Sequence, residues 1–372
     1  MICKTLNVLL LLLIGAGCLE AQLIAPNGMK KGAWRSKDVP EGWAVYNIGR
    51  YEFQSDAPEE KVRKVGRHLN AMFDLYLKTF PSGRTPKRFV VKIFKDRQGF
   101  LDYGAPPQAG AYYSWTDKEM VGYDTGKIGG QLDGKGVTGD REGGLADLLR
   151  SRYTMDLLGV FAHEGWHQYF HWLCTSKISF PSWCDEGIGE YFYTAMLEES
   201  GKAKLGAAND YRLGTIKAAI RQNKHIPLKE LVTYDQAKYY RVAGLAYAQG
   251  WSLVHFFLEH PDWKKQRHLS RFVKIFVDEH SIEEAVDRVF GKTDWEKLES
   301  DWKEWVLKLE FTDAAAAKAA LEDLAELNAK EGLEGLPPSE PAGKEQKPAG
   351  EAERKPEGEP RPERKPEPPP QG

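Results

Sequence analysis

Two short motifs constrain this 372-residue chain more than any other feature. The first is His163-Glu164-Gly165-Trp166-His167, and the second is Trp183-Cys184-Asp185-Glu186-Gly187. Because an α-helix has about 3.6 residues per turn, side chains four positions apart lie on one face, so both imidazoles of the first motif can point at one ion. Eighteen residues separate His167 from Glu186, enough to end one helix, turn and begin another. The sequence therefore predicts two helices that face each other across a metal.

The residue types of these motifs indicate the chemistry expected there. Two histidines and one glutamate leave a fourth position open, which is the catalytic rather than the closed structural arrangement for zinc. Glu164 points about 100° away from His163 around the helix axis, so it is poorly placed as a ligand but can take a proton from a water on the same ion. With nine histidines in 372 residues, a His-acid-x-x-His pattern arises by chance about 0.03 times per chain. Two histidines that merely pack on a buried helix are therefore the weaker interpretation.

Both motifs resemble, in order and spacing, those of the gluzincin zinc metallopeptidases, the group that includes thermolysin and the M1-type aminopeptidases. His163-Glu164-x-x-His167-Gln168-Tyr169-Phe170 is similar to the first aminopeptidase motif, and Trp183-x-x-Glu186-Gly187 is similar to the second. They also resemble uncharacterised secreted bacterial families grouped as peptidase MA-like. The resemblance implies one Zn²⁺ per chain, held by His163, His167 and Glu186, with Glu164 as the general base.

The resemblance implies two further site residues. Thermolysin-like enzymes carry an acid four positions after the glutamate ligand, where it accepts the N–H of the first histidine ligand; that position here is Glu190. The alternative for Glu190 is a solvated helix carboxylate. M1-type enzymes stabilise the oxyanion with a tyrosine in a Tyr-x-Lys-Gly setting, to which Tyr247-Ala248-Gln249-Gly250 is similar except at Gln249. Tyr239 and Tyr240 are rivals for that role, and a core position is the alternative for Tyr247.

The chain also departs from the aminopeptidase pattern. It lacks the Gly-Ala-Met-Glu-Asn stretch whose glutamate grips a free substrate amine, so an M1-type exopeptidase is disfavoured. In the corresponding place two β-prone runs, 109–115 and 120–123, flank a polar turn and predict a hairpin whose edge strand would bind substrate backbone. His171 is eight residues from His163, about 12 Å along a helix, which is too far to share one ion. We expect His171 to pack or to face substrate.

Hydrophobic periodicity predicts an α+β chain with the architecture of a thermolysin-like zincin. Strands at 43–48, 51–53 and 88–94 and a helix at 59–80 predict a small N-terminal mixed sheet lobe over the active-site helix, which begins near Thr154 or Asp156 and runs through Trp172. A mainly helical C-terminal lobe is expected from segments at 188–199, 211–222, 228–231, 243–258, 269–278, 282–290 and 295–309. The predicted organisation is a signal peptide at 1–18, a catalytic domain at 33–205, a helical lobe at 206–312, and an Ala-rich helix with a disordered Pro/Glu/Lys-rich tail at 313–372.

The N-terminus is typical of an export signal. An apolar run from Val8 to Ile14 precedes small residues and is too short to span a bilayer. Ala16-Gly17-Cys18 fits a bacterial lipobox, but Gly15 stands where leucine is usual. Plain secretion and a lipid anchor on Cys18 therefore both stay open.

Cysteine usage and charge narrow the setting further. Cys174 and Cys184 fall between His167 and Glu186, in a compartment that permits oxidation, so a disulfide across that loop and two buried free thiols are the alternatives. The formal net charge is −2, which gives no basic field for nucleic acid.

These features together predict an exported zinc-dependent metallopeptidase that acts on a peptide or protein and binds no nucleic acid. Two other classes stay open. One is a catalytically silent zinc- and peptide-binding scaffold, which the intact Glu164 disfavours. The other is an amide hydrolase that acts on cell-wall peptide, which nothing in the sequence excludes.

Overall fold

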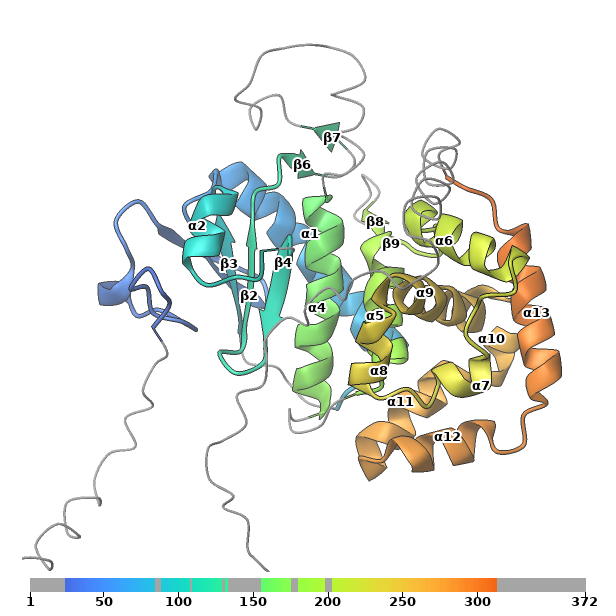
Figure 1. Ribbon diagram of the computed structural model, residues 1–372. Helices are drawn as coiled ribbons and strands as arrows, with labels where there is room; N and C mark the ends of the chain where they lie inside the picture. The colour runs from blue at the N-terminus through green and yellow to red at the C-terminus, as the bar shows by residue number, and fades with distance from the viewer. Residues whose placement is uncertain are drawn as a thin grey trace, which may run out of the picture. The chain divides into compact units, whose positions relative to one another are not determined.

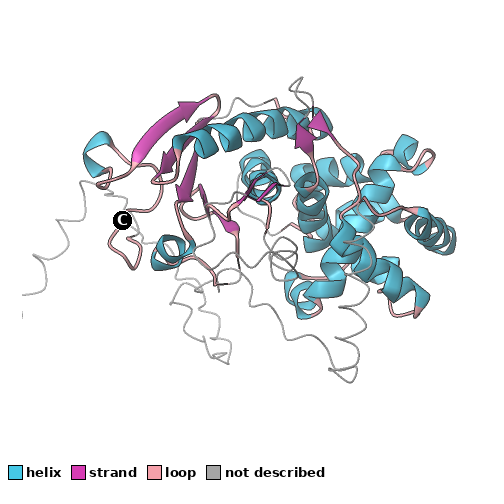
Figure 2. Ribbon diagram, turned by 90° about the horizontal axis from the view of Figure 1, so that it is seen from above, coloured by secondary structure: helices cyan, strands magenta, loops and turns pink. Residues whose placement is uncertain are grey.

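The computed structural model describes residues 24–83, 88–107, 109–128, 131–132, 155–174, 180–197 and 203–312. These residues form a mixed α+β structure within one compact unit, with the five-stranded sheet at one side and the C-terminal helices at the other (Figures 1 and 2). The predicted signal peptide, Cys18 and the predicted tail at 313–372 lie outside the described residues. Among the helices that are described, none has the length and apolarity needed to cross a membrane.

The main sheet has five strands in the order β1-β2-β3-β5-β4. Strands β2 and β3 are parallel, as are β3 and β5, whereas β1 and β4 run antiparallel to their neighbours. The predicted hairpin is confirmed as the antiparallel pair β4 and β5, which places β4 at an edge of this sheet. The strand bounds are β1 Ala44–Ile48, β2 Tyr51–Ser55, β3 Phe89–Phe94, β4 Ala111–Ser114 and β5 Glu119–Tyr123.

Side chains of the strands alternate between the two faces of the sheet, and each face packs against a separate hydrophobic cluster. Phe53, Val91 and Met120 belong to the main core, together with apolar residues of α1 (Glu59–Thr79) and α4 (Leu157–Cys174). Phe94 of β3 and Val121 of β5 point the other way, into a second cluster that includes residues of α2 (Arg97–Asp102) and of the N-terminal segment. Helix α1 connects the parallel strands β2 and β3.

A buried ion pair fastens the N-terminal segment to the outer face of the sheet. Lys92 and Glu119 have no exposed side-chain surface and contact each other directly. Tyr103 Oη donates to Glu119 at 2.6 Å, the Gly32 amide donates to Glu119 at 2.7 Å, and Lys92 donates to the Gly32 carbonyl at 2.5 Å. Because every charged group here has partners, the burial cost is offset, and removal of one partner would leave the other charge uncompensated.

Helix α4 lies between the sheet and the C-terminal helices (Figure 1), with α1, β4 and β5 on one side and α5 (Ser182–Tyr193) on the other. Apolar residues occur on all faces of α4, as expected for a helix that is buried on several sides. Helix α9 has the same character and packs against α5, α6, α11 and α13. The further helices are α6 Asp210–Arg221, α7 Leu228–Leu231, α8 Gln236–Arg241, α9 Ala243–Glu259, α10 Trp263–Gln266, α11 His268–Glu279, α12 Ile282–Phe290 and α13 Trp295–Lys308. Three short pieces complete the list: the 3-10 turn Ser36–Asp38, the strand pair β6 Lys127–Ile128 and β7 Gln131–Leu132, and the pair β8 Met196–Leu197 and β9 Ala203–Lys204.

The predicted helix at 188–199 is wrong in its bounds. Helix α5 starts earlier, at Ser182 directly after Pro181, and ends at Tyr193. Thr194 Oγ1 donates to the carbonyls of Tyr191, at 3.2 Å, and Ala207, at 3.1 Å, and the chain then enters β8. Helices α2, α8 and α10, of four to six residues, were not predicted, whereas α7, which is equally short, was.

The burial of His268 predicts a loss of stability in mild acid. Its ring stacks between Phe257 and Phe290, with centroids 5.4 and 5.5 Å away, and burial lowers its pKa to about 4. The unfolded chain binds this proton near pH 6.5, so between pH 6.5 and 4 the unfolded state holds more protons and stability falls as the pH falls. Between pH 7.5 and 5, the free energy of unfolding of wild type should fall by about 1–2 kcal/mol more than that of His268→Phe. Urea titration of both proteins at the two pH values measures this difference. Parallel losses in the two proteins would show that His268 does not titrate in this way.

Candidate metal centre

Three predicted ligand residues converge in the structure. His163 and His167 lie one turn apart on α4, and Glu186 lies on the facing helix α5. His163 Nε2 is 3.2 Å from Glu186 Oε2 and 3.1 Å from His167 Nε2, and His167 Nε2 is 3.5 Å from Glu186 Oε2. Two imidazole nitrogens and a carboxylate oxygen thus face one common point. All three side chains are largely buried.

The spacing of these atoms fits a small tetrahedral cation. Zinc bonds of about 2.0–2.1 Å in tetrahedral geometry place neighbouring ligand atoms about 3.3–3.4 Å apart. The three measured separations of 3.1, 3.2 and 3.5 Å bracket that value. Two nitrogen donors also favour zinc or a related transition metal over calcium, which takes six to eight oxygens at longer distances. These three residues therefore fit a zinc ion as a ligand set.

The local sequence explains how α5 can approach α4 so closely. A Cβ atom on Gly189 would lie 2.8 Å from the His163 ring, so only glycine leaves room for that imidazole. On the opposite side, a Cβ on Gly187 would lie 2.6 Å from the backbone oxygen of Gly250 in α9. The two glycines that flank Ile188 thus let α5 fit between the histidine helix and α9.

The charge state of Glu186 suits a metal ligand. Burial alone would raise its pKa, but the imidazoles of His167 and His163 hold the pKa of Glu186 well below its usual range. The residue is therefore a carboxylate, which is the form that binds metals.

Asp185 is a partner of this site that the sequence did not reveal. Its Oδ1 lies 3.0 Å from His167 Nδ1 and accepts a hydrogen bond from Trp166 Nε1 at 2.9 Å. A proton on His167 Nδ1 would leave the Nε2 lone pair facing Glu186, which fixes the tautomer needed for a ligand. Only the adjacency of Asp185 to Glu186 hinted at this, because pairing with His167 depends on how two helices cross.

Glu190 lies beside His163 but is held by another residue. Its Oε1 is 3.8 Å from His163 Nδ1, which is longer than a hydrogen bond, so the expected bond is not formed. Arg212 instead binds both carboxylate oxygens, at 2.8 and 3.0 Å, and Asn209 Nδ2 donates to Oε2 at 2.9 Å. Burial would raise the pKa of Glu190, but Arg212 lowers it. The solvated alternative is excluded, since Glu190 is only 6% exposed.

The three candidate tyrosines form one cluster and separate by their contacts. Tyr239 is fully buried and donates to the Ala246 carbonyl at 3.0 Å, so its hydroxyl is committed to the backbone. Tyr240 donates to Glu186 Oε1. Tyr247 is half-buried, with its ring 6.1 Å from that of Tyr240 and under the guanidinium of Arg212 at 5.0 Å. No hydrogen bond joins the Tyr247 hydroxyl to another residue in the described ranges, which leaves it available to a ligand.

Glu164 connects the metal site to the edge of the sheet. Its carboxylate accepts a hydrogen bond from the backbone amide of Tyr113 in β4. Burial raises the pKa of Glu164, and the neighbouring imidazoles of His167 and His163 offset this only in part. A raised pKa makes the carboxylate a stronger base, as proton abstraction from water requires.

His171 and the cysteines take structural positions. The His171 ring packs edge-on against Tyr113, with centroids 5.1 Å apart, one helical turn beyond His167. Cys174 and Cys184 are buried free thiols, so the structure has the second of the two alternatives and no disulfide joins them. Burial raises the pKa of both thiols, which makes them unreactive.

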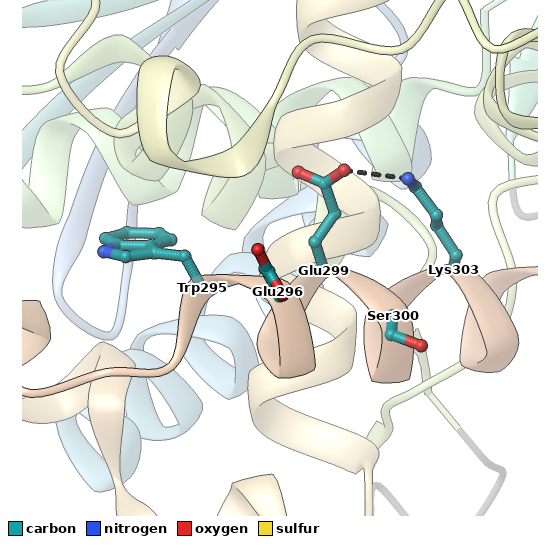
Figure 3. A pocket seen from close by; sticks show the side chains of 5 residues that line it. All are labelled: Trp295, Glu296, Glu299, Ser300 and Lys303. Carbon is teal, nitrogen blue, oxygen red and sulfur yellow. Dashed lines mark ion pairs between the residues drawn. The ribbon is translucent and has the colours of Figure 1, made fainter.

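An open surface depression on α13 has no part in this site. One acid–base pair lines it, Lys303 with Glu299 at 2.8 Å, and Glu299 also accepts the Leu228 amide at 2.9 Å (Figure 3). The bond from Leu228 attaches α7 to α13, which is a structural role. The depression is lined by Trp295, Glu296, Glu299, Ser300 and Lys303.

Comparison with known proteins places part of the chain in a described family model. Residues 158–276 match a family described as "Protein of unknown function (DUF1570)". No curated protein matches the chain. The matched segment is about a third of the chain and runs from α4 into α11, so it contains the three candidate ligands, Glu164 and the tyrosine cluster.

Proposed function

We propose that this protein is an exported zinc-dependent metallopeptidase of gluzincin type, with a thermolysin-like arrangement of its sheet and helices. The observation that carries the proposal is the convergence of His163 Nε2, His167 Nε2 and Glu186 Oε2 to within 3.5 Å of one another. The order of elements supports it as well: a sheet with an antiparallel edge strand, a helix with two histidines, and a second helix with the glutamate.

Each residue of the site has a chemical task in this proposal. Bound zinc would act as a Lewis acid toward the scissile carbonyl and lower the pKa of water. Glu164 would take the proton of the attacking water as its oxygen bonds to the carbonyl carbon, and would then pass that proton to the amine nitrogen, so that the C–N bond breaks as the C=O bond re-forms. Tyr247, whose hydroxyl has no hydrogen bond to another described residue, would donate to the oxygen that becomes negative in the transition state.

The edge strand β4 supports a peptide substrate in particular. An edge strand offers unpaired backbone groups to an extended peptide, which adds to the sheet as a further strand. The hydrogen bond from the Tyr113 amide to Glu164 shows that β4 passes directly beside the proposed base. A peptide aligned with β4 would therefore carry its carbonyl groups past Glu164 and the three ligands.

The proposal is tested by metal analysis and hydrolysis together. We expect the purified mature protein to contain one zinc per chain and to cleave members of a mixed peptide library, with the activity lost on chelation and restored by zinc. Mass spectrometry of the products would reveal the cleavage preference. Zinc without any cleavage would instead support a binding protein, cleavage restricted to cell-wall peptides would support the amide hydrolase, and a protein without zinc would contradict the whole assignment.

A further inference from the structure

Glu186 presents its two oxygens to different partners. Oε2 faces His163 Nε2 at 3.2 Å and His167 Nε2 at 3.5 Å, whereas Oε1 accepts the hydroxyl proton of Tyr240. A carboxylate is an acceptor only and a phenol is a donor, so the direction of this bond is fixed. The Glu186 carboxylate is thus held at both oxygens, at Oε2 by the two histidines of α4 and at Oε1 by Tyr240 of α8.

Tyr240 reaches Glu186 from a separate part of the fold. Helix α8 is mostly exposed, and Tyr239 is its only fully buried residue, anchored through its hydroxyl to the Ala246 carbonyl at 3.0 Å. The Tyr240 ring lies perpendicular to that of Tyr239, with centroids 5.7 Å apart, and half-buried beside Tyr247. This packing aims the Tyr240 hydroxyl at Glu186 from a helix other than the two that carry the candidate ligands.

The contact decides how many oxygens Glu186 can offer. A carboxylate can bind a metal through one oxygen or through both, and a second oxygen would fill a place that a catalytic site keeps open. We propose, on the basis of the zinc site in the proposed function, that Tyr240 is a positioning residue: its hydrogen bond to Oε1 restricts Glu186 to one-oxygen coordination. Tyr240 thereby raises zinc affinity and keeps a position free for water or substrate. Outer partners of this kind typically account for about 10–100-fold in metal affinity.

The test is Tyr240→Phe, which removes only the hydroxyl. We expect the dissociation constant for Zn²⁺, measured by competition with a chromophoric chelator, to rise about 10–100-fold. We also expect the Co²⁺-loaded variant to absorb more weakly in the visible range than Co²⁺-loaded wild type, because that absorption weakens when the coordination number rises above four. Tyr211→Phe is the matched control: it makes the same change at an exposed tyrosine of α6, away from the contact with Glu186, and it should keep the wild-type affinity and spectrum.

The possible failures are distinguishable. Wild-type affinity and spectrum in Tyr240→Phe would overturn the role of Tyr240 and leave the zinc site intact. An equal loss of affinity in Tyr211→Phe would also overturn it, since the effect would then not depend on contact with Glu186. If wild type binds no zinc, the proposed function itself fails. Circular dichroism of each metal-free variant checks that the fold is kept.

Discussion

Glu164→Gln is expected to lower kcat/KM for peptide hydrolysis by at least about 10²–10⁴-fold, the contribution typical of a general base. Glutamine has the size of glutamate and its amide oxygen can still accept the Tyr113 N–H, so the contact with β4 is kept. What it loses is the ability to take a proton. The effect should therefore fall on kcat, with KM and zinc content close to wild type.

Matched measurements separate this loss of base from other causes. Glu60→Gln makes the same chemical change at an exposed position of α1 and should keep full activity. Zinc content, measured by atomic emission, should be one per chain in wild type and in both variants. Full zinc-dependent activity in Glu164→Gln would exclude Glu164 as the base. Lost activity together with lost zinc would mean that Glu164 acts through the metal ligands.

The parts of the fold predicted correctly from sequence are those fixed by local repeats. The helix that carries His163 and His167, the hairpin of β4 and β5, and most C-terminal helices each follow from a run of apolar residues at one period. The convergence of Glu186 with the two histidines was predictable because the second motif has a fixed distance from the first. For the helices and the hairpin the signal lies within a few residues of the feature it predicts, and for Glu186 it lies in the spacing of two short motifs.

The outer contacts of the site were not predictable in the same way. Arg212 binds Glu190 from 22 positions away, and Tyr240 binds Glu186 from 54 positions away. Such pairs depend on the crossing of α5 with helices that come much later in the chain. Arginine is common in surface helices, so Arg212 did not stand out by type, and Tyr240 was considered only as a rival of Tyr247 for stabilising the oxyanion. The expected bond from His163 to Glu190 fails for this reason, since Arg212 takes both oxygens of that carboxylate.

Glu186→Gln is expected to weaken zinc binding by more than the roughly 10–100-fold typical of an outer partner. The amide that replaces the carboxylate is neutral and a poor zinc ligand, and two histidines alone do not complete a catalytic zinc site. Added zinc at 100 times its dissociation constant should stabilise wild type by about 2.7 kcal/mol, which appears as a rise in Tm. Glu186→Gln should show little of this rise, whereas Glu60→Gln should show all of it.

This comparison also separates a metal centre from a buried ion pair. If Glu186 only balanced the charge of His163 and His167, the substitution would destabilise the metal-free protein, because a buried histidine would lose its partner. Zinc would then raise the Tm of wild type and variant by the same amount, or raise neither. If Glu186 is a ligand, the variants differ mainly when zinc is present. An equal zinc-dependent shift in Tm for wild type and Glu186→Gln would therefore rule out Glu186 as a ligand, whatever the substitution does to the metal-free protein.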